Sequence, residues 1–392
     1  VYVAQARALR AYCTMLMAQS FQFSPLQAPN APCVPVVKEI DDIYSGITRA
    51  TVADVYDFIM DDLDAAIAGL EGFTRTSKGL IDVNVAYGLR ARASLLTGAY
   101  QQAYDDAVAA AQGYTPASVA EVSVPAFMDI SEHNWIWGFD MNADLASSGY
   151  GRYATTSSWL RSFSAYAYST GGGVYATINR LLYDKIPSTD VRKGWWVDDY
   201  LRSPNIAGMT WTDGDDLAFA DDGNKVEYLA YTNVKFGCYT IGTVLNDEDM
   251  PLMRVEEMLL IQAEAKARLG AEAEAASILN GFVQDYRDAS YQYDGTRTLL
   301  DEILFQRRIE LWGEGVGLFD VIRFDKPMVR YHEGVRSNVP ESYRFNLPAR
   351  SDLFLLPIPT NIINSYPGMV QNNLPSDPTP LSNGSLRDGV TD

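Results

Sequence analysis

Two stretches of the chain carry the pattern of an antiparallel helical pair, and this pattern limits the possible folds more than any other feature. In residues 83–112, apolar residues recur every three or four positions on both sides of Gly98, which is the spacing of a buried helix face. Residues 254–282 repeat this arrangement around Gly270. Because small residues let two helices approach closely, each stretch predicts two helices packed against each other.

Other helical patterns flank these pairs. Residues 4–18 carry a buried stripe, and a second helix is expected to begin at Thr51, because Asp54 three residues later completes a variant of the capping box. Residues 299–312 form a further amphipathic helix. The pairs resemble tetratricopeptide units, although they lie too far apart for a tandem array of repeats. The chain is therefore predicted to be mainly α and built from tetratricopeptide-like helical pairs.

Residues 115–250 differ in character from the helical segments. They are rich in Gly, Ser, Thr, Asp and aromatic residues, and short strands such as 228–236 are expected among them. We interpret them as an irregular, loop-rich insert in a helical scaffold of residues 1–114 and 251–373, while the Pro- and Ser-rich residues 374–392 predict an extended tail. No linker of useful length separates these parts, so all 392 residues are expected to form one domain.

The charge of the chain excludes several classes of partner. The chain has 31 basic and 50 acidic residues, which give a formal net charge of −19. A nucleic-acid partner is therefore not expected, because phosphate binding needs a clustered basic face. A neutral or cationic ligand suits this charge better than an anionic one. No stretch reaches the roughly 18 apolar residues of a membrane-spanning helix.

Few side chains are available for a metal or redox site. The two histidines, His133 and His332, stand apart, and the three scattered cysteines form no C-x-x-C pair. We therefore expect neither a cofactor nor a metal ion. A calcium site around Asp213, Asp215 and Asp216 is the one exception considered, because calcium takes oxygen ligands and needs no histidine.

A dense acid–base cluster follows the last long helical pattern. Carboxylates at helical spacing can share a face and act as acid and base, so the cluster could be mistaken for a catalytic site. We interpret it as structural, because alternating charges around Ile309 and Trp312 are what a helix needs at the edge of a core. The cluster consists of Arg307, Arg308, Glu310, Glu314, Asp320 and Arg323.

The aromatic residues of the insert are the strongest candidates for a ligand site. Sugar rings have apolar faces and polar rims, so their sites combine flat aromatic side chains with short polar groups. Trp135 and Trp211 are second choices for this role. The leading candidates stand together in a Gly/Ser/Thr-rich stretch that offers little bulk to bury their rings, and they are Tyr150, Arg152, Tyr153 and Trp159. No catalytic residue is expected among them.

Several segments resemble, in order, the SusD/RagB family of outer-membrane nutrient-binding lipoproteins. The segments bracket nearly the whole chain, and their order as well as their content carries the resemblance. They are residues 6–12, 49–66, 89–96, 254–265, 307–323, 356–359 and 371–373.

The resemblance implies a SusD-like fold in which helical pairs support an irregular, ligand-facing region. It also implies non-catalytic binding of a glycan at the bacterial outer membrane, for delivery to a TonB-dependent transporter of the SusC type. A RagB-like peptide ligand remains an alternative. The chain begins within a predicted helix, so we expect upstream sequence, including an N-terminal lipid anchor that would hold the protein at the cell surface.

Two other functions remain open at this point. An α-helical glycoside hydrolase would need two carboxylates at separations of about 5 Å or about 6.5–9.5 Å, and no such pair stands out in the insert. A tetratricopeptide scaffold would instead bind a protein segment through helices such as 85–110 and 255–280.

Overall fold

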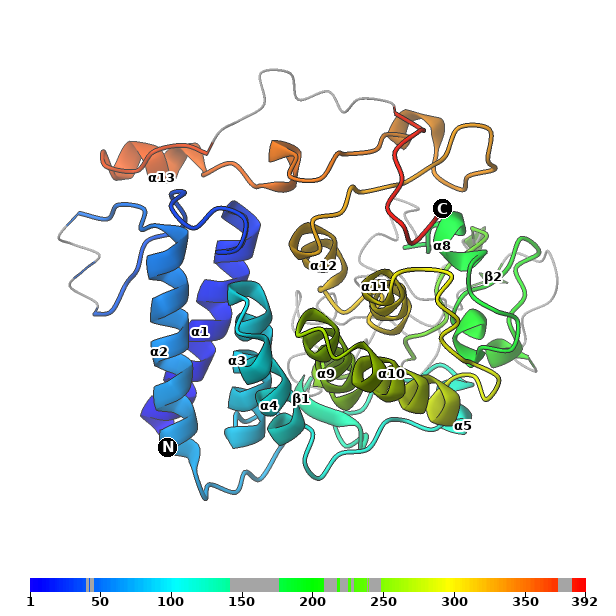
Figure 1. Ribbon diagram of the computed structural model, residues 1–392, viewed down its shortest axis with the longest axis horizontal. Coiled ribbons are helices and arrows are strands. Elements are labelled where there is room, and N and C mark those ends of the chain that lie inside the picture. The colour runs from blue at the N-terminus through cyan, green and yellow to red at the C-terminus, as the bar shows by residue number, and fades with distance from the viewer. Residues whose placement is uncertain are drawn as a thin grey trace.

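Antiparallel helical pairs form the scaffold of this computed structural model. In chain order the pairs are α1 (Tyr2–Phe21) with α2 (Val52–Leu70), α3 (Val83–Thr97) with α4 (Tyr100–Ala110), and α9 (Val255–Arg268) with α10 (Glu272–Tyr286). Figure 1 shows α1 and α2 upright at one side of the molecule, with α3 and α4 next to them and α9 and α10 beyond. The predicted mainly α fold with tetratricopeptide-like pairs is confirmed.

The remaining helices are shorter or follow the last pair. The structure describes residues 1–39, 42, 46–141, 176–207, 217–218, 225–226, 229–237, 239, 248–372 and 383–392. Within these ranges the other elements are α5 (Val119–Val122), α8 (Arg180–Tyr183), α11 (Leu299–Glu310), α12 (Gly317–Arg323), α13 (Thr360–Ser365) and the 3-10 turns η3 (Val191–Trp195), η4 (Pro204–Ile206), η5 (Glu341–Tyr343) and η6 (Asp352–Phe354). None of these described helices has the length and apolar character needed to cross a membrane.

Local signals determine where the first helices begin and end. Thr51 is the N-cap of α2, and its side chain accepts a hydrogen bond from the backbone N–H of Asp54. Gly98 ends α3 in the left-handed conformation with φ +83°, which glycine adopts without steric cost. A Cβ atom at Gly98 would also lie 2.9 Å from Leu26 Cδ2, so a larger residue at this position would collide with the Leu26 side chain.

The scaffold core consists of small and branched side chains from the facing helices. Leu96 is 4% exposed and Leu311 is 2% exposed, whereas Leu259 is only half-buried. Arg10 on α1 also forms an ion pair with the buried Asp62 on α2, with 2.7 Å between Arg10 Nε and Asp62 Oδ2. The first pair is therefore held by an ion pair as well as by apolar packing.

Two short antiparallel ladders accompany the helices. The strand β1 (Trp135–Phe139) pairs with β4 (Met250–Arg254), and β2 (Leu217–Ala218) pairs with β3 (Lys225–Val226). The strand predicted over residues 228–236 is wrong in its described part, where Thr232, Asn233 and Phe236 make isolated bridges instead. The β1–β4 ladder joins the beginning of the insert to the start of α9.

The insert shares a second hydrophobic core with α11 and the last residues of the chain. Large aromatic rings fill much of it, because the described part of the insert contributes only short helices such as α5 and α8. Trp195 and Trp196 pack with ring centroids 6.1 Å apart, and Trp196 meets Trp312 edge-on at 5.6 Å. The fully buried rings of this core are Phe127, Trp135, Trp195, Trp196 and Phe236.

The segment after α12 crosses over the helical pairs. Figure 1 shows it running above α1 and α2, where it carries α13, and shows the C-terminus of residues 383–392 beside α8. The last residues are tightly packed. Val390 is fully buried, and Asp388 forms an ion pair with Arg308, with 2.9 Å between Arg308 Nη1 and Asp388 Oδ2. The end of the chain therefore forms part of the wall around α11.

A buried ion pair links the third helical pair to α12. Arg323 Nη2 donates to Glu264 Oε2 at 2.8 Å, and Arg268 Nε donates to Glu264 Oε1 at 2.7 Å. Burial alone would raise the pKa of Glu264, but the two guanidinium groups outweigh it and lower the pKa to about 2. The ionised carboxylate is therefore favoured by folding.

Stability is expected to depend on this group in acid. The folded pKa of Glu264 lies below the ordinary value of 4.5, so the unfolded chain binds its proton first as the pH falls. The stabilisation is complete above about pH 4.5 and is lost as the pH falls toward about 2. Urea unfolding from pH 2.5 to 6 measures it, and Glu264→Gln should flatten the slope. Equal slopes in both proteins would contradict this assignment.

Candidate functional site

Most of the predicted ligand-binding residues fall outside the part of the chain that the structure describes. These are Tyr150, Arg152, Tyr153, Trp159 and Trp211, together with the calcium candidates Asp213, Asp215 and Asp216. Among the residues that are described, no group of three or more His, Cys, Asp or Glu side chains could hold a metal ion.

Trp135 is described, and the prediction for it has to be corrected. Its side chain is fully buried, and Nε1 donates to Glu132 Oε2 at 3.0 Å. The cause is the pairing of β1 with β4, which places the ring in the same hydrophobic core as Phe127 and Trp195. Trp135 therefore has no free ring face on which a sugar could stack.

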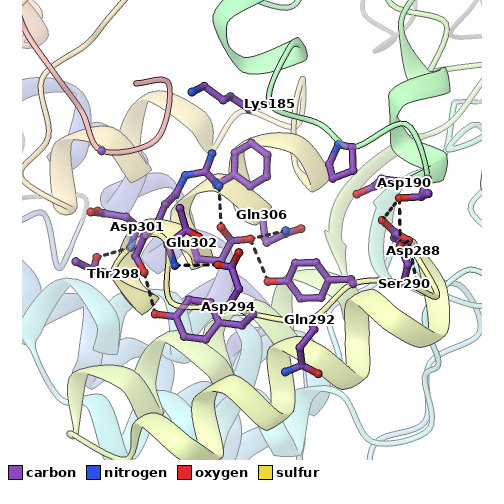
Figure 2. Close-up of a pocket in the computed structure, with 18 of the residues that line it drawn as sticks. Lys185, Asp190, Asp288, Ser290, Gln292, Asp294, Thr298, Asp301, Glu302 and Gln306 are labelled. Carbon is purple, nitrogen blue, oxygen red and sulfur yellow. Dashed lines mark hydrogen bonds and ion pairs between the residues drawn. The ribbon is translucent and has the colours of Figure 1, made fainter.

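A cleft of about 710 Å³ lies where the insert meets α11. We call it the α11 cleft, and Figure 2 shows its polar lining. Its walls come from the loop after α8, the connection between α10 and α11, the first turns of α11 and the last residues of the chain. It is lined by Lys185, Pro187, Thr189, Asp190, Asp288, Ser290, Tyr291, Gln292, Tyr293, Asp294, Thr296, Arg297, Thr298, Asp301, Glu302, Phe305, Gln306, Gly389 and Asp392.

Glu302 lies at the centre of the α11 cleft (Figure 2). Its Oε1 accepts hydrogen bonds from the Tyr291 hydroxyl at 3.0 Å and from Gln306 Nε2 at 2.8 Å. Its Oε2 accepts one from Arg297 Nη1 at 2.9 Å. Because these donors come from both the connection and α11, they fix the connection against the helix. The Arg297 guanidinium also lies 4.3 Å from the Phe305 ring centroid.

A second group of hydrogen bonds holds the opposite side of the α11 cleft. Figure 2 places Asp190, Asp288 and Ser290 together there. Thr189 Oγ1 donates to Asp288 Oδ2 at 2.6 Å, and Ser290 Oγ donates to Asp288 Oδ1 at 2.7 Å. Burial alone would raise the pKa of Asp288, but these hydrogen bonds outweigh it and lower the pKa. This carboxylate is therefore ionised at neutral pH.

Two tyrosines give the α11 cleft its aromatic surface. Tyr291 and Tyr293 are both half-buried, and the Tyr293 hydroxyl donates to the Arg297 carbonyl at 2.9 Å. Burial raises the pKa of Tyr291, and the adjacent Glu302 carboxylate raises it further. Both phenols therefore stay neutral, and their rings lie beside hydroxyl, amide and carboxylate groups. This combination suits a sugar ring.

The sequence contains a signal for these tyrosines as well. In residues 288–298, Tyr291 and Tyr293 stand among Asp, Ser, Gly and Thr residues. The stretch around Trp159 has a similar mixture of aromatic and short polar residues. The segment lies between two predicted helices within the scaffold of residues 251–373, so the sequence prediction of the ligand site in residues 115–250 does not include it.

A neighbouring cleft of about 620 Å³ lies within the insert. It shares Thr189 and Asp190 with the α11 cleft, so the two form adjoining hollows. Tyr183 contributes an aromatic ring, with Lys193 Nζ 4.7 Å from its centroid. Burial lowers the pKa of Lys193, and its Nζ donates to the Ile186 carbonyl at 2.7 Å.

Two members of the acid–base cluster at the end of α11, Glu310 and Glu314, belong to a buried ionic network. Glu310 is fully buried, and Arg287 Nε donates to Glu310 Oε2 at 2.8 Å. Arg192 Nη1 and Arg254 Nη1 also reach this carboxylate, at 3.3 Å and 3.2 Å. Burial alone would raise the pKa of Glu310, but the three guanidinium groups lower it strongly. This network joins the insert to α11 and leaves Glu310 fully buried among guanidinium groups, which supports the structural interpretation for this part of the cluster.

Comparison with known proteins gives one family and many similar structures. The SusD family matches residues 129–375. A SusD-like carbohydrate binding protein from Bacteroides vulgatus is 24% identical, over 93% of this chain and 76% of that protein, with a TM-score of 0.71. A comparison with curated proteins gave no match.

Two further structures show the same likeness. A SusD superfamily protein from Bacteroides thetaiotaomicron is 23% identical, over 95% of this chain and 77% of that protein, with a TM-score of 0.72. A SusD superfamily protein from Bacteroides vulgatus is 20% identical, over 94% of this chain and 76% of that protein, also with a TM-score of 0.72. At these identities the structures establish a shared fold.

Proposed function

The chain belongs to the SusD family, and from this premise we propose that it binds a glycan without catalysis. The glycan would pass to a TonB-dependent transporter of the SusC type at the outer membrane, where a lipid anchor would hold the protein at the cell surface. The observation that supports glycan binding is the α11 cleft, in which two half-buried tyrosines lie beside polar groups. The likeness to a SusD-like carbohydrate binding protein points in the same direction.

The carboxylates of the α11 cleft support binding rather than turnover. A glycoside hydrolase needs a carboxylic acid whose pKa is raised, so that it can donate a proton. In the cleft, the pKa of Asp288 is lowered as described above, and the backbone N–H of Thr296 lowers the pKa of Asp294. Glu302 accepts three hydrogen bonds, and Asp190 is ion-paired with Arg192 at 2.7 Å. These carboxylates accept hydrogen bonds from the protein itself, which suits an ionised, structural role in a binding site better than proton donation.

The proposed site extends from the α11 cleft into the insert. Tyr293 would provide one aromatic surface, and the insert would provide others. The proposed residues of the insert are Tyr150, Arg152, Tyr153, Trp159 and Trp211. Carboxylate side chains outnumber Lys and Arg side chains in the lining of the cleft. A neutral or amino-bearing glycan is therefore favoured over an acidic one.

A ligand search with two kinds of array is the first experiment. Purified protein would be applied to glycan and peptide arrays, and product chromatography would follow incubation with the oligosaccharides that bind. Glycan binding without new products supports the proposal. Exclusive peptide binding would favour the RagB-like alternative, and released products would favour a glycoside hydrolase.

Removing an aromatic ring should then weaken glycan binding without unfolding the protein. Trp159→Ala and Tyr293→Ala are each expected to raise the Kd about threefold or more, because a ring contact contributes about 0.5–1.5 kcal/mol beyond area burial. Calorimetry and thermal melts of both variants measure this. Tyr343→Ala removes a ring that is 58% exposed outside the cleft, and it should change neither quantity.

The buried Trp135 provides the opposite control. Trp135→Ala should lower the stability by about 3–5 kcal/mol and leave the Kd of the folded fraction unchanged. If Trp159→Ala and Tyr293→Ala behave in this way as well, both rings are core residues and the glycan binds elsewhere.

A further inference from the structure

A smaller cavity of about 260 Å³ lies between α1, α3, α9 and the segment from α11 to α12. We call it the arginine cavity. It shares no lining residue with either cleft described above, so it is a separate feature of the scaffold. Most of its wall is apolar and is formed by Met15, Leu16, Leu95, Leu96, Leu252, Ile261, Val316 and Phe319.

Arg307 is the unusual group in the wall of the arginine cavity. The side chain is 3% exposed, and its Nε donates to Asp320 Oδ2 at 2.8 Å. Its Nη1 is buried and has no hydrogen-bond partner in the described part of the chain. A buried charged donor without an acceptor is costly and rare in folded proteins. An acceptor from outside the chain would satisfy it.

The charges around Arg307 leave a positive excess. Arg307 and Arg323 share Asp320, with Arg323 Nε 2.8 Å from Asp320 Oδ1. Arg323 in turn shares Glu264 with Arg268. These three guanidinium groups face two carboxylates, so this connected set has a formal charge of +1.

The other carboxylates at the cavity wall are already neutralised. Glu257 is paired with Arg92, with 2.8 Å between Arg92 Nε and Glu257 Oε1. Glu314 is paired with both Lys235, at 2.6 Å, and Arg254, at 2.8 Å. The positive excess at Arg307 is therefore not cancelled by its neighbours, and a single negative charge would balance it.

We propose that the arginine cavity binds a small carboxylate with an apolar body. One carboxylate oxygen accepts from Arg307 Nη1, and the apolar body packs against the leucine, isoleucine and phenylalanine side chains of the wall. Guanidinium and carboxylate groups match in geometry as well as in charge. Inorganic phosphate would satisfy the charge but leave the apolar wall unfilled, so the apolar carboxylate is the better fit. This site is independent of glycan binding.

Titration of the purified chain with octanoate tests the proposal. Octanoate is expected to bind at a single site, while acetate and inorganic phosphate bind at least about tenfold more weakly, because each lacks the apolar body. Octanol should also bind more weakly, because it lacks the charge. Absence of saturable octanoate binding by the wild-type protein would overturn the proposal.

A matched pair of variants locates the ligand. Arg307→Gln should weaken octanoate binding about tenfold or more, because hydrogen bonds to charged groups are the strong ones. Arg308→Gln makes the same charge change at the next residue of α11, but Arg308 pairs with Asp388, so octanoate affinity should not change. Equal losses in the two variants would show a general charge effect and refute the site.

Arg307→Gln also removes the hydrogen bond from Arg307 to Asp320, so this variant could misfold. A second variant tests the site without this change. Leu16 is half-buried on α1 and lines the cavity, so Leu16→Trp should fill the space from the surface. We expect octanoate binding to disappear, with thermal stability and glycan affinity unchanged. Octanoate binding that survives in folded Leu16→Trp would place the carboxylate elsewhere.

Discussion

Replacing Glu310 by glutamine is expected to lower the free energy of unfolding by about 3–5 kcal/mol, since it removes one partner from a buried ionic network. Arg192, Arg254 and Arg287 all converge on this carboxylate, and all four side chains are fully buried. Without its charge, three guanidinium groups would remain in the core with too little negative charge. Chemical denaturation at neutral pH measures the loss.

Glu341→Gln is the matched control for this experiment. Glu341 is exposed in η5, so the same substitution there should leave the denaturation midpoint within error. If the two variants have the same midpoint, the network contributes little to stability and its role is to orient the insert on α11.

Leu96→Ala is expected to lower the free energy of unfolding by about 2–5 kcal/mol, as other large-to-small core substitutions do. Leu96 is 4% exposed on α3 and belongs to the main core cluster, and its removal would enlarge the arginine cavity. Leu311→Ala should cost a similar amount. Leu259→Ala should lower the free energy of unfolding by less, because Leu259 is half-buried and part of its side chain already contacts water.

Leu9→Ala provides the comparison for these leucines. Leu9 is 47% exposed on α1, so its truncation should change the free energy of unfolding by less than about 0.5 kcal/mol. Thermal or urea unfolding of the four variants gives the ranking. Wild-type stability in Leu96→Ala would mean that the pairing of α3 with its neighbours has been misassigned.

The helical scaffold could be predicted from the sequence because its signals are local. Helix periodicity covers a few turns, and the hydrogen bond between Thr51 and Asp54 spans three residues. Gly98 similarly marks the end of α3 through its own backbone conformation. In each case the residues that determine the structure stand next to each other in the chain.

The β1–β4 ladder was not predicted, because its two strands lie far apart in the sequence. Trp135 pairs with Arg254, and nothing near either residue specifies the other. Residues 250–254 also run directly into α9, so their apolar side chains look like the beginning of a helix. Long-range pairing of this kind depends on the folded context rather than on a local pattern.

The ligand-site prediction failed at Trp135 for a related physical reason. A loop-rich composition suggested that aromatic rings would be exposed, but rings from separated segments of the insert pack together with α11 side chains in one core. Trp195 and Phe127, for example, pack edge-on with centroids 5.5 Å apart. The composition of a segment gives the number of its aromatic rings. Whether a ring is buried depends on which other segments pack against it in the folded protein.

The β1–β4 ladder has a consequence for how this kind of protein can acquire new specificity. Phe139 and Met250 are register partners in the ladder, so the two ends of the segment between them lie side by side. Anything inserted between them begins and ends at one anchor point. Doubling the length of a flexible loop costs only about 0.6 kcal/mol in closure entropy. Loops between residues 140 and 249 can therefore lengthen at little cost as long as Arg192 and Lys235 keep their ion pairs with Glu310 and Glu314.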